Sequence, residues 1–99
     1  MTVLHLPGEA AELIRGAAAR AWPREACGLL VGRMVGGGDL AVSRAVESAN
    51  LLADSRTDRF EVDAGLRARL QRELRGDGGG LAIIGHWHSH PDAPAEPSA

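Results

Sequence analysis

Two unbroken apolar runs constrain the fold of this 99-residue chain more than any other feature. The first covers residues 26–32, and the second covers residues 81–84, at the start of a segment that continues to Trp87. A strand with one face in water alternates polar and apolar residues, and neither run does so. Both are expected to be buried strands, and the second is too apolar for a sheet edge. Strands of this kind need cover on both faces of their sheet.

Two amphipathic segments can supply that cover. In residues 9–22, the apolar residues fall on one face at helical spacing, and Pro23 ends the helix because proline disfavours helical geometry at the preceding residue. A second helix is expected to begin after Asp63, a good N-cap, and to run to about Arg75. Its face is marked by a leucine at every fourth position: Leu66, Leu70 and Leu74.

The remaining segments complete one domain. Short strands are expected at residues 2–6, 40–48 and 59–62, a glycine-rich hairpin turn at 36–39, irregular chain at 50–58, and a loop at 77–80. Residues 89–99 are polar and rich in proline, which predicts a surface loop. The sequence therefore predicts a single α/β domain: a mixed β-sheet with one helix packed against each side.

Composition narrows the class of protein. A formal charge of −2 gives no reason to expect nucleic acid or an anionic membrane as partner, and the four arginines of the second helix are expected to form a solvated face. The single cysteine, Cys27, excludes an internal disulfide and is expected to be a small buried thiol. No signal peptide and no apolar run of about 20 residues is visible, so the expected location is the cytoplasm.

Three of the four histidines, His86, His88 and His90, stand at alternate positions. In a strand, residues i and i+2 point to the same face, about 6.6–7 Å apart, so two such imidazoles can converge on one zinc ion. The outer two of three lie about 13 Å apart, so one pair is expected to bind metal while the third histidine does something else. Trp87, between them, points to the opposite face and is expected in the core.

Two histidines do not make a catalytic zinc site. Catalytic zinc usually has three protein ligands and an open position for water, and a carboxylate commonly takes the proton from that water. Asp92 and Glu96 are candidates close to the histidines, and Glu25 is a candidate at the mouth of the first apolar run. Taken alone, the context of Glu25 favours a solvated residue at a strand end.

The combination of Glu25, the run 26–32, the histidine segment and Ser98 resembles the JAMM (JAB1/MPN/Mov34) metalloproteases, most of all their small prokaryotic members. In that family an early Glu is followed far downstream by His-x-His, seven residues, Ser, two residues and Asp. His88 and His90 match the paired histidines, and Ser98 falls on the serine. Residues 59–63 also resemble a recurrent strand-to-helix segment. The resemblance implies an MPN-type fold and zinc-dependent hydrolysis of peptide or isopeptide bonds.

The resemblance also implies a role for each matched residue. His88 and His90 would ligate zinc, Glu25 would polarise the zinc-bound water and pass its proton to the leaving amine, and Ser98 would stabilise the oxyanion. His86 is not one of the matched residues. It is expected to support the site without binding the metal, because a ligating histidine needs its other ring nitrogen anchored by a nearby group, and the alternative is that it only fills the face of the strand. The implied substrates are ubiquitin-like or sulfur-carrier proteins, cleaved after their C-terminal glycines. The alternative within the same fold is a catalytically inactive MPN-type protein-interaction module.

One family position falls outside the sequence. The acidic third ligand is expected three residues after Ser98, at position 101, whereas the sequence ends at Ala99. The 99 residues are therefore expected to correspond to a family domain that lacks its C-terminal part. On that expectation the 99 residues by themselves hold zinc weakly or not at all and are nearly inactive, and an uncovered part of the sheet favours self-association.

Overall fold

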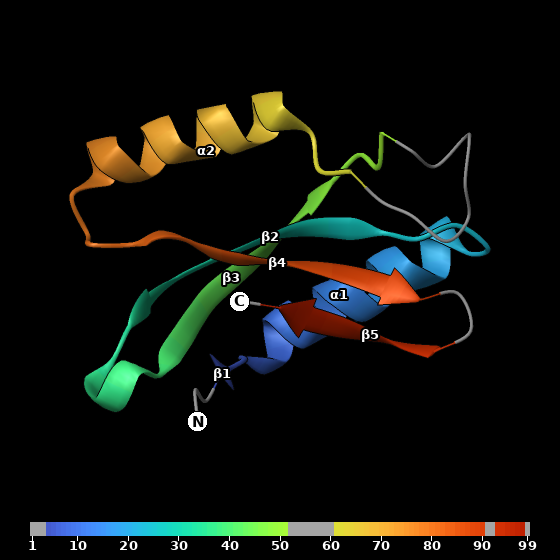
Figure 1. The fold of residues 1–99 in the computed structure, drawn as a ribbon, viewed down its shortest axis with the longest axis horizontal. Coiled ribbons are helices and arrows are strands. Elements are labelled where there is room, and N and C mark those ends of the chain that lie inside the picture. The colour runs from blue at the N-terminus through green and yellow to red at the C-terminus, as the bar shows by residue number, and fades with distance from the viewer. Residues whose placement is uncertain (1–3, 52–60, 91–92, 99) are drawn as a thin grey trace.

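The computed structural model describes residues 4–51, 61–90 and 93–98, the last six and His90 without their side chains. These residues form a five-stranded sheet with α1 (Gly8–Ala21) on one face and α2 (Ala64–Asp77) on the other (Figure 1). In spatial order the strands are β1 (Leu4–His5), β3 (Leu40–Ser48), β2 (Cys27–Met34), β4 (Ala82–His90) and β5 (Ala93–Ser98). A 3-10 turn at Gly36–Gly38 joins β2 to β3.

The pairing makes the sheet mixed, as predicted. β1 runs parallel to β3, and the other three pairings are antiparallel. β2 lies at the centre and β4 beside it, each between two other strands. Leu29, Leu30 and Val31 of β2 are fully buried. Both apolar runs therefore lie in internal strands, as predicted. Only the first run is buried, because in the second Ala82 is exposed and Ile83 and Ile84 are partly exposed.

The alternation of side chains along β2 divides the core into two layers. Leu30 packs on the α1 side with Ile14 and Ala17 of that helix. Leu29 and Val31, one position to either side, pack on the α2 side with that helix's Leu70 and Leu74. Successive strand residues point to opposite faces, so one apolar strand fills both layers. The expected helix against each side of the sheet is confirmed.

Trp87 lies in the core, as predicted; it belongs to the layer under α1 and is fully buried. Its indole Nε1 donates to the carbonyl oxygen of Val46 at 3.3 Å. The ring lies over Gly28, where a Cβ would come within 2.5 Å of Nε1. Glycine at position 28 therefore makes room for the largest side chain of the core.

The ends of both helices follow from local chemistry. Asp63 caps α2, because its Oδ1 accepts a hydrogen bond from the amide of Gly65 at 2.8 Å. α2 ends before Gly78, which adopts a left-handed conformation with φ 71°. α1 ends at Ala21, two residues before Pro23. No helix among the described residues is long and apolar enough to cross a membrane.

The prediction of a surface loop over residues 89–99 is wrong. β4 continues to His90, and Ala93–Ser98 form β5, which pairs antiparallel with β4 and places Ser98 opposite His86. Prolines in this segment suggested a loop, but an outermost strand tolerates proline because one side of its ladder needs no donor. The predicted strand 59–62 is only partly covered: positions 59 and 60 lie outside the described residues, and Val62 forms one isolated bridge with Asn50.

Candidate metal centre

The candidate site lies where β2 begins and β4 ends. Antiparallel pairing of these strands sets Cys27, the first residue of β2, opposite His88 near the end of β4. Glu25 stands two residues before Cys27, so the same pairing brings its side chain to the end of β4. The fold thereby brings Glu25 close to His88, although 63 positions separate the two residues in the sequence.

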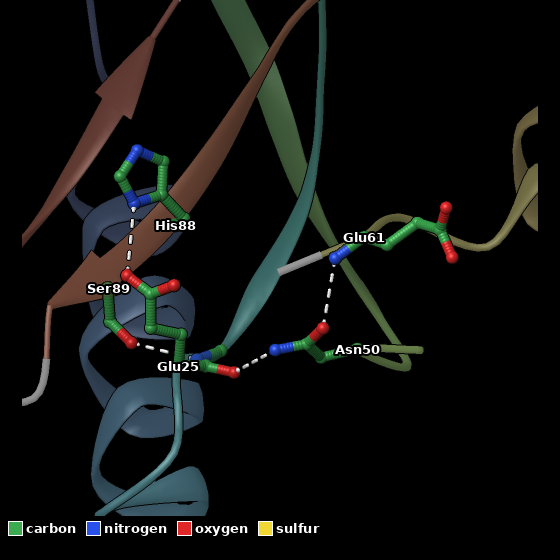
Figure 2. A network of polar contacts seen from close by, with 6 residues as sticks. Glu25, Asn50, Glu61, His88 and Ser89 are labelled. Atoms are coloured by element: carbon green, nitrogen blue, oxygen red, sulfur yellow. Dashed lines mark hydrogen bonds and ion pairs between the residues drawn. The ribbon is translucent and has the colours of Figure 1, made fainter. Parts of the chain in front are cut away.

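The side chains of Glu25 and His88 meet directly (Figure 2). Glu25 Oε1 lies 3.7 Å from His88 Nδ1, and the exposed fractions of the two side chains are 4% and 22%. This distance is within ion-pair range but longer than the about 2.7–3.2 Å of a hydrogen bond. The carboxylate thus lies beside the imidazole, in a site that shields Glu25 almost fully from solvent and leaves one part of His88 open.

The two described histidine rings lie on one face of β4, as the alternation predicted. The ring centroids of His86 and His88 are 6.3 Å apart, with an angle of 19° between the ring planes. Trp87, between them, points into the core under α1. The supporting role of His86 and the choice between the two histidine pairs stay predictions, because the side chain of His90 lies outside the described residues.

Ser89 is a site residue that reading the sequence missed. It is buried, with 3% of its surface exposed. Its hydroxyl oxygen accepts a hydrogen bond from the amide of Ala26 at 2.8 Å, and its own amide donates to the carbonyl oxygen of Ala26 at 2.9 Å. A signal was present, because Ser89 stands two positions after Trp87 and therefore points into the same buried layer.

Asn50 is the second residue that was missed. Its Nδ2 donates to the carbonyl oxygen of Glu25 at 2.9 Å, and its Oδ1 accepts from the amide of Glu61 at 2.9 Å (Figure 2). The amide of Leu51 donates to the carbonyl oxygen of Glu61 at 3.0 Å. The side chain of Asn50 thereby connects the backbone of Glu25 to the chain segment that leads into α2.

Cys27 is a buried thiol, as predicted. Burial raises the pKa of this thiol from 9.0 to about 11, although a hydrogen bond with Ser48 acts in the opposite direction. The thiolate is the form that binds metals and attacks electrophiles. Near neutral pH, Cys27 is therefore a protonated core residue.

Other expected site residues fall beyond the described side chains. Ser98 is opposite His86 and Glu96 is opposite His88 in the pairing of β5 with β4, but their side chains lie outside the described part, as does all of Asp92. No group of three His, Cys, Asp or Glu side chains suited to a metal ion occurs among the described residues. Of the site residues expected from the sequence, the structure thus describes the side chains of Glu25, His88 and His86.

The donor chemistry of these side chains fits zinc. Imidazole nitrogen and carboxylate oxygen are both zinc ligands in proteins. His88 presents Nδ1 to the carboxylate of Glu25, and its other ring nitrogen points away from that carboxylate (Figure 2). A carboxylate beside one nitrogen of a histidine is also the arrangement that orients the other nitrogen toward a metal. His88 is therefore one of the residues that could hold such an ion.

Of two hollows on the described part of the molecule, one borders the candidate site and the other does not. One of about 320 Å³ is lined by Glu25 and Asn50 together with residues of α1 and the end of β3. A larger one, about 560 Å³, lies between the C-terminal half of α2 and the start of β4, at the opposite end of these strands. Its lining includes Arg67, Arg75 and Leu74 but none of the site residues. The candidate site is therefore chosen by the contact of Glu25 with His88 and not by the volume of the hollow.

Comparison with solved structures finds proteins of similar fold. The chain is similar to protein DSY2949 from Desulfitobacterium hafniense, with 35% identity and a TM-score of 0.75, over 100% of this chain and 63% of that one. It is also similar to a protein from Salinibacter ruber (strain DSM 13855), with 34% identity and a TM-score of 0.57, over 96% of this chain and 61% of that one. The chain thus spans about three fifths of the length of each.

The family comparison covers nearly the whole sequence. Residues 7–99 match the model of the prokaryotic homologs of the JAB domain. A comparison with curated proteins found no match. The match includes Glu25, the histidine segment and Ser98, which are the residues that carried the resemblance in the sequence. The chain therefore belongs to the family of prokaryotic homologs of the JAB domain.

Proposed function

We propose that this protein is a zinc-dependent metallopeptidase that hydrolyses peptide or isopeptide bonds. The observation that carries the proposal is the contact between Glu25 Oε1 and His88 Nδ1 at 3.7 Å, in a chain of the JAB-domain family. Glu25 is 3% exposed, and a carboxylate buried this far is almost never found unless it is paired with another group. A buried carboxylate beside a half-buried imidazole is a pattern suited to metal-assisted hydrolysis.

Each residue has a distinct task in this proposal. His88 and His90 would hold the zinc ion, which when bound lowers the pKa of a coordinated water toward about 7 and polarises the scissile carbonyl. Glu25 accepts the proton of the attacking water and delivers it to the leaving amine. Its carboxylate lies 3.7 Å from His88 Nδ1, and the low exposure of Glu25 keeps bulk water from competing for that proton.

Ser98 would donate a hydrogen bond to the oxygen that gains negative charge as the carbonyl is attacked. One donor of this kind typically contributes about 2.7–4 kcal/mol to the stability of the transition state. The pairing of β5 with β4 supports this role, since it brings the backbone of Ser98 beside that of His86.

We further propose that the substrate is the C-terminal tail of a ubiquitin-like or sulfur-carrier protein, cleaved after its glycines. Support comes from the family and from the sheet, in which β5 is the outermost described strand next to β4. An extended tail can add to such an edge through backbone hydrogen bonds. Glycines at the scissile position suit this mode, because a residue without Cβ lets the backbone approach closely.

The experiment uses the full-length protein loaded with zinc and a small sulfur-carrier protein extended by a few residues after its Gly-Gly terminus. Mass spectrometry should find a product that ends at the last glycine. A chelator should abolish the cleavage and added zinc should restore it, and a substrate with alanine in place of the last glycine should react more slowly. Zinc-loaded protein that binds the substrate without cleaving it would instead support the interaction-module alternative. Cleavage that a chelator leaves unchanged would contradict metal-dependent hydrolysis.

A further inference from the structure

The peptide group between Glu25 and Ala26 lies one residue outside the β2 ladder, which begins at Cys27. Both of its polar groups are nevertheless bonded, and in each case by a side chain. The carbonyl oxygen of Glu25 accepts from Asn50 Nδ2 at 2.9 Å, and the amide of Ala26 donates to Ser89 Oγ at 2.8 Å (Figure 2). The two side chains come from different segments, one that follows β3 and one at the end of β4.

The hydroxyl of Ser89 takes the place of a backbone carbonyl in the pairing of Ala26 with Ser89. In an antiparallel pair, two opposite residues exchange both of their N–H···O=C bonds. Here Ser89 keeps one of them, from its amide to the carbonyl oxygen of Ala26 at 2.9 Å, while the reverse bond runs to its hydroxyl instead. Ser89 is 3% exposed and Ala26 is 5% exposed, so water has little access to the amide if the hydroxyl is removed.

Asn50 fixes the other side of the same peptide group. Its amide group also accepts from the backbone amide of Glu61 at 2.9 Å, so its orientation is set at both ends. A peptide group is planar, and bonds to both its carbonyl and its amide hold that plane in one orientation. The plane adjoins the Cα of Glu25 and therefore limits the direction in which the side chain leaves the backbone.

We propose that Ser89 and Asn50 are positioning residues that hold the Glu25–Ala26 peptide and so keep the Glu25 carboxylate beside His88. The catalytic part of this inference rests on the proposed function, whereas the geometric part does not. Displacing a reacting group by about 1 Å can cost on the order of 10²-fold in rate. A loss of either bond should therefore act on turnover through Glu25 and leave substrate binding unchanged.

The geometric part is tested by NMR on the full-length, metal-free protein with Ser89→Ala, and with Ser89→Thr, which keeps a hydroxyl, as the matched control. We expect Ser89→Ala to speed hydrogen exchange of the Ala26 amide by roughly tenfold, as loss of one buried hydrogen bond implies, and to leave the Leu30 amide unchanged. The Overhauser contact between the Glu25 side chain and the His88 ring should weaken in Ser89→Ala and persist in Ser89→Thr. An unchanged contact in Ser89→Ala would overturn the inference.

The catalytic part is tested by kinetics on the zinc-loaded protein. Ser89→Ala should lower kcat by at least about tenfold with KM and zinc stoichiometry unchanged, and Ser89→Thr should restore it. In a Glu25→Gln background, Ser89→Ala should cause no further loss, because its effect passes through Glu25. A further equal loss in that background would overturn the positioning role.

A second variant covers the case in which Ser89→Ala does not fold. Asn50→Asp removes the donor to the carbonyl oxygen of Glu25, and the same loss of kcat is expected. A wild-type protein without hydrolysis would refute the proposed function, while the NMR contact still decides the geometry.

Discussion

The two faces of the sheet are built from the same strands but differ in how completely they are covered. Under α1, buried residues of the helix, of β2 and β3, and Trp87 form one continuous layer. Under α2, the buried layer consists of Leu29, Val31, Leu70 and Leu74, and it does not reach the end of β4 where His86 and His88 lie. Both faces use the same alternation: Trp87 points to the closed face and its two neighbours point to the open one.

Because of this difference, one face of the sheet is expected to determine folding stability, and the other carries the candidate site. The packed face fixes the alignment of β2 with β4, and that alignment sets Cys27 opposite His88 and brings Glu25 to the site. The open face leaves the side chain of His88 22% exposed, which access by a metal or substrate requires. Changes on the closed face should therefore reduce folding stability, and changes at the site should reduce activity with little effect on stability.

The largest effect is expected from Trp87→Ala. Removing a fully buried indole leaves a cavity under α1, and such substitutions typically cost about 3–5 kcal/mol in the free energy of unfolding. Urea denaturation measures this cost. Met34→Ala is the control, because Met34 is 70% exposed and its truncation should change stability by no more than about 0.5 kcal/mol. Similar costs for both variants would show that the closed face does not dominate stability.

The next effect concerns Glu25→Gln. This variant keeps the shape of the side chain and removes the proposed proton acceptor, so turnover should fall at least about 10²-fold. Zinc stoichiometry and the free energy of unfolding should stay near the wild-type values. Steady-state kinetics and denaturation on the same preparation measure both quantities. Near-normal turnover in this variant would refute the role of Glu25 as proton acceptor.

Much of this organisation can be predicted from the sequence, because it depends on local patterns. The unbroken runs identify the internal strands, the leucine repeat identifies α2, and the alternation around Trp87 separates core from site. β5 could not be predicted in this way, because whether a proline-containing segment joins a sheet depends on an edge being available, which is a tertiary property.

In the candidate site too, residues whose role depends on tertiary structure could not be predicted from the sequence. Glu25 and His88 could be selected from the sequence through the family pattern, and the fold brings them together. Ser89 and Asn50 could not, because each acts by bonding the backbone of a residue far away in the chain. A polar side chain that bonds a distant peptide group leaves no periodic signal, and only the pairing of β2 with β4 reveals its partner.

The smallest effect is expected at Cys27. Its pKa is raised from 9.0 to about 11 in the folded protein, so between these pH values the unfolded chain has lost the thiol proton while the folded chain retains it. The free energy of unfolding contributed by this group should therefore be complete below pH 9 and decline as the pH rises toward 11. Denaturation at pH 8 and pH 10 should show a smaller decline in Cys27→Ala than in the wild type. Equal declines would contradict a buried, protonated thiol.

The most direct test of the metal centre is a calorimetric zinc titration of the full-length protein and three single variants: His86→Ala, His88→Ala and His90→Ala. The wild type and His86→Ala should each bind one zinc ion per chain, because the proposed ligands are His88 and His90 and not His86. His88→Ala and His90→Ala should lose tight binding, because each removes one nitrogen ligand. If His86→Ala abolishes zinc binding and His90→Ala does not, the ligand pair is His86 and His88, and the proposed centre is wrong.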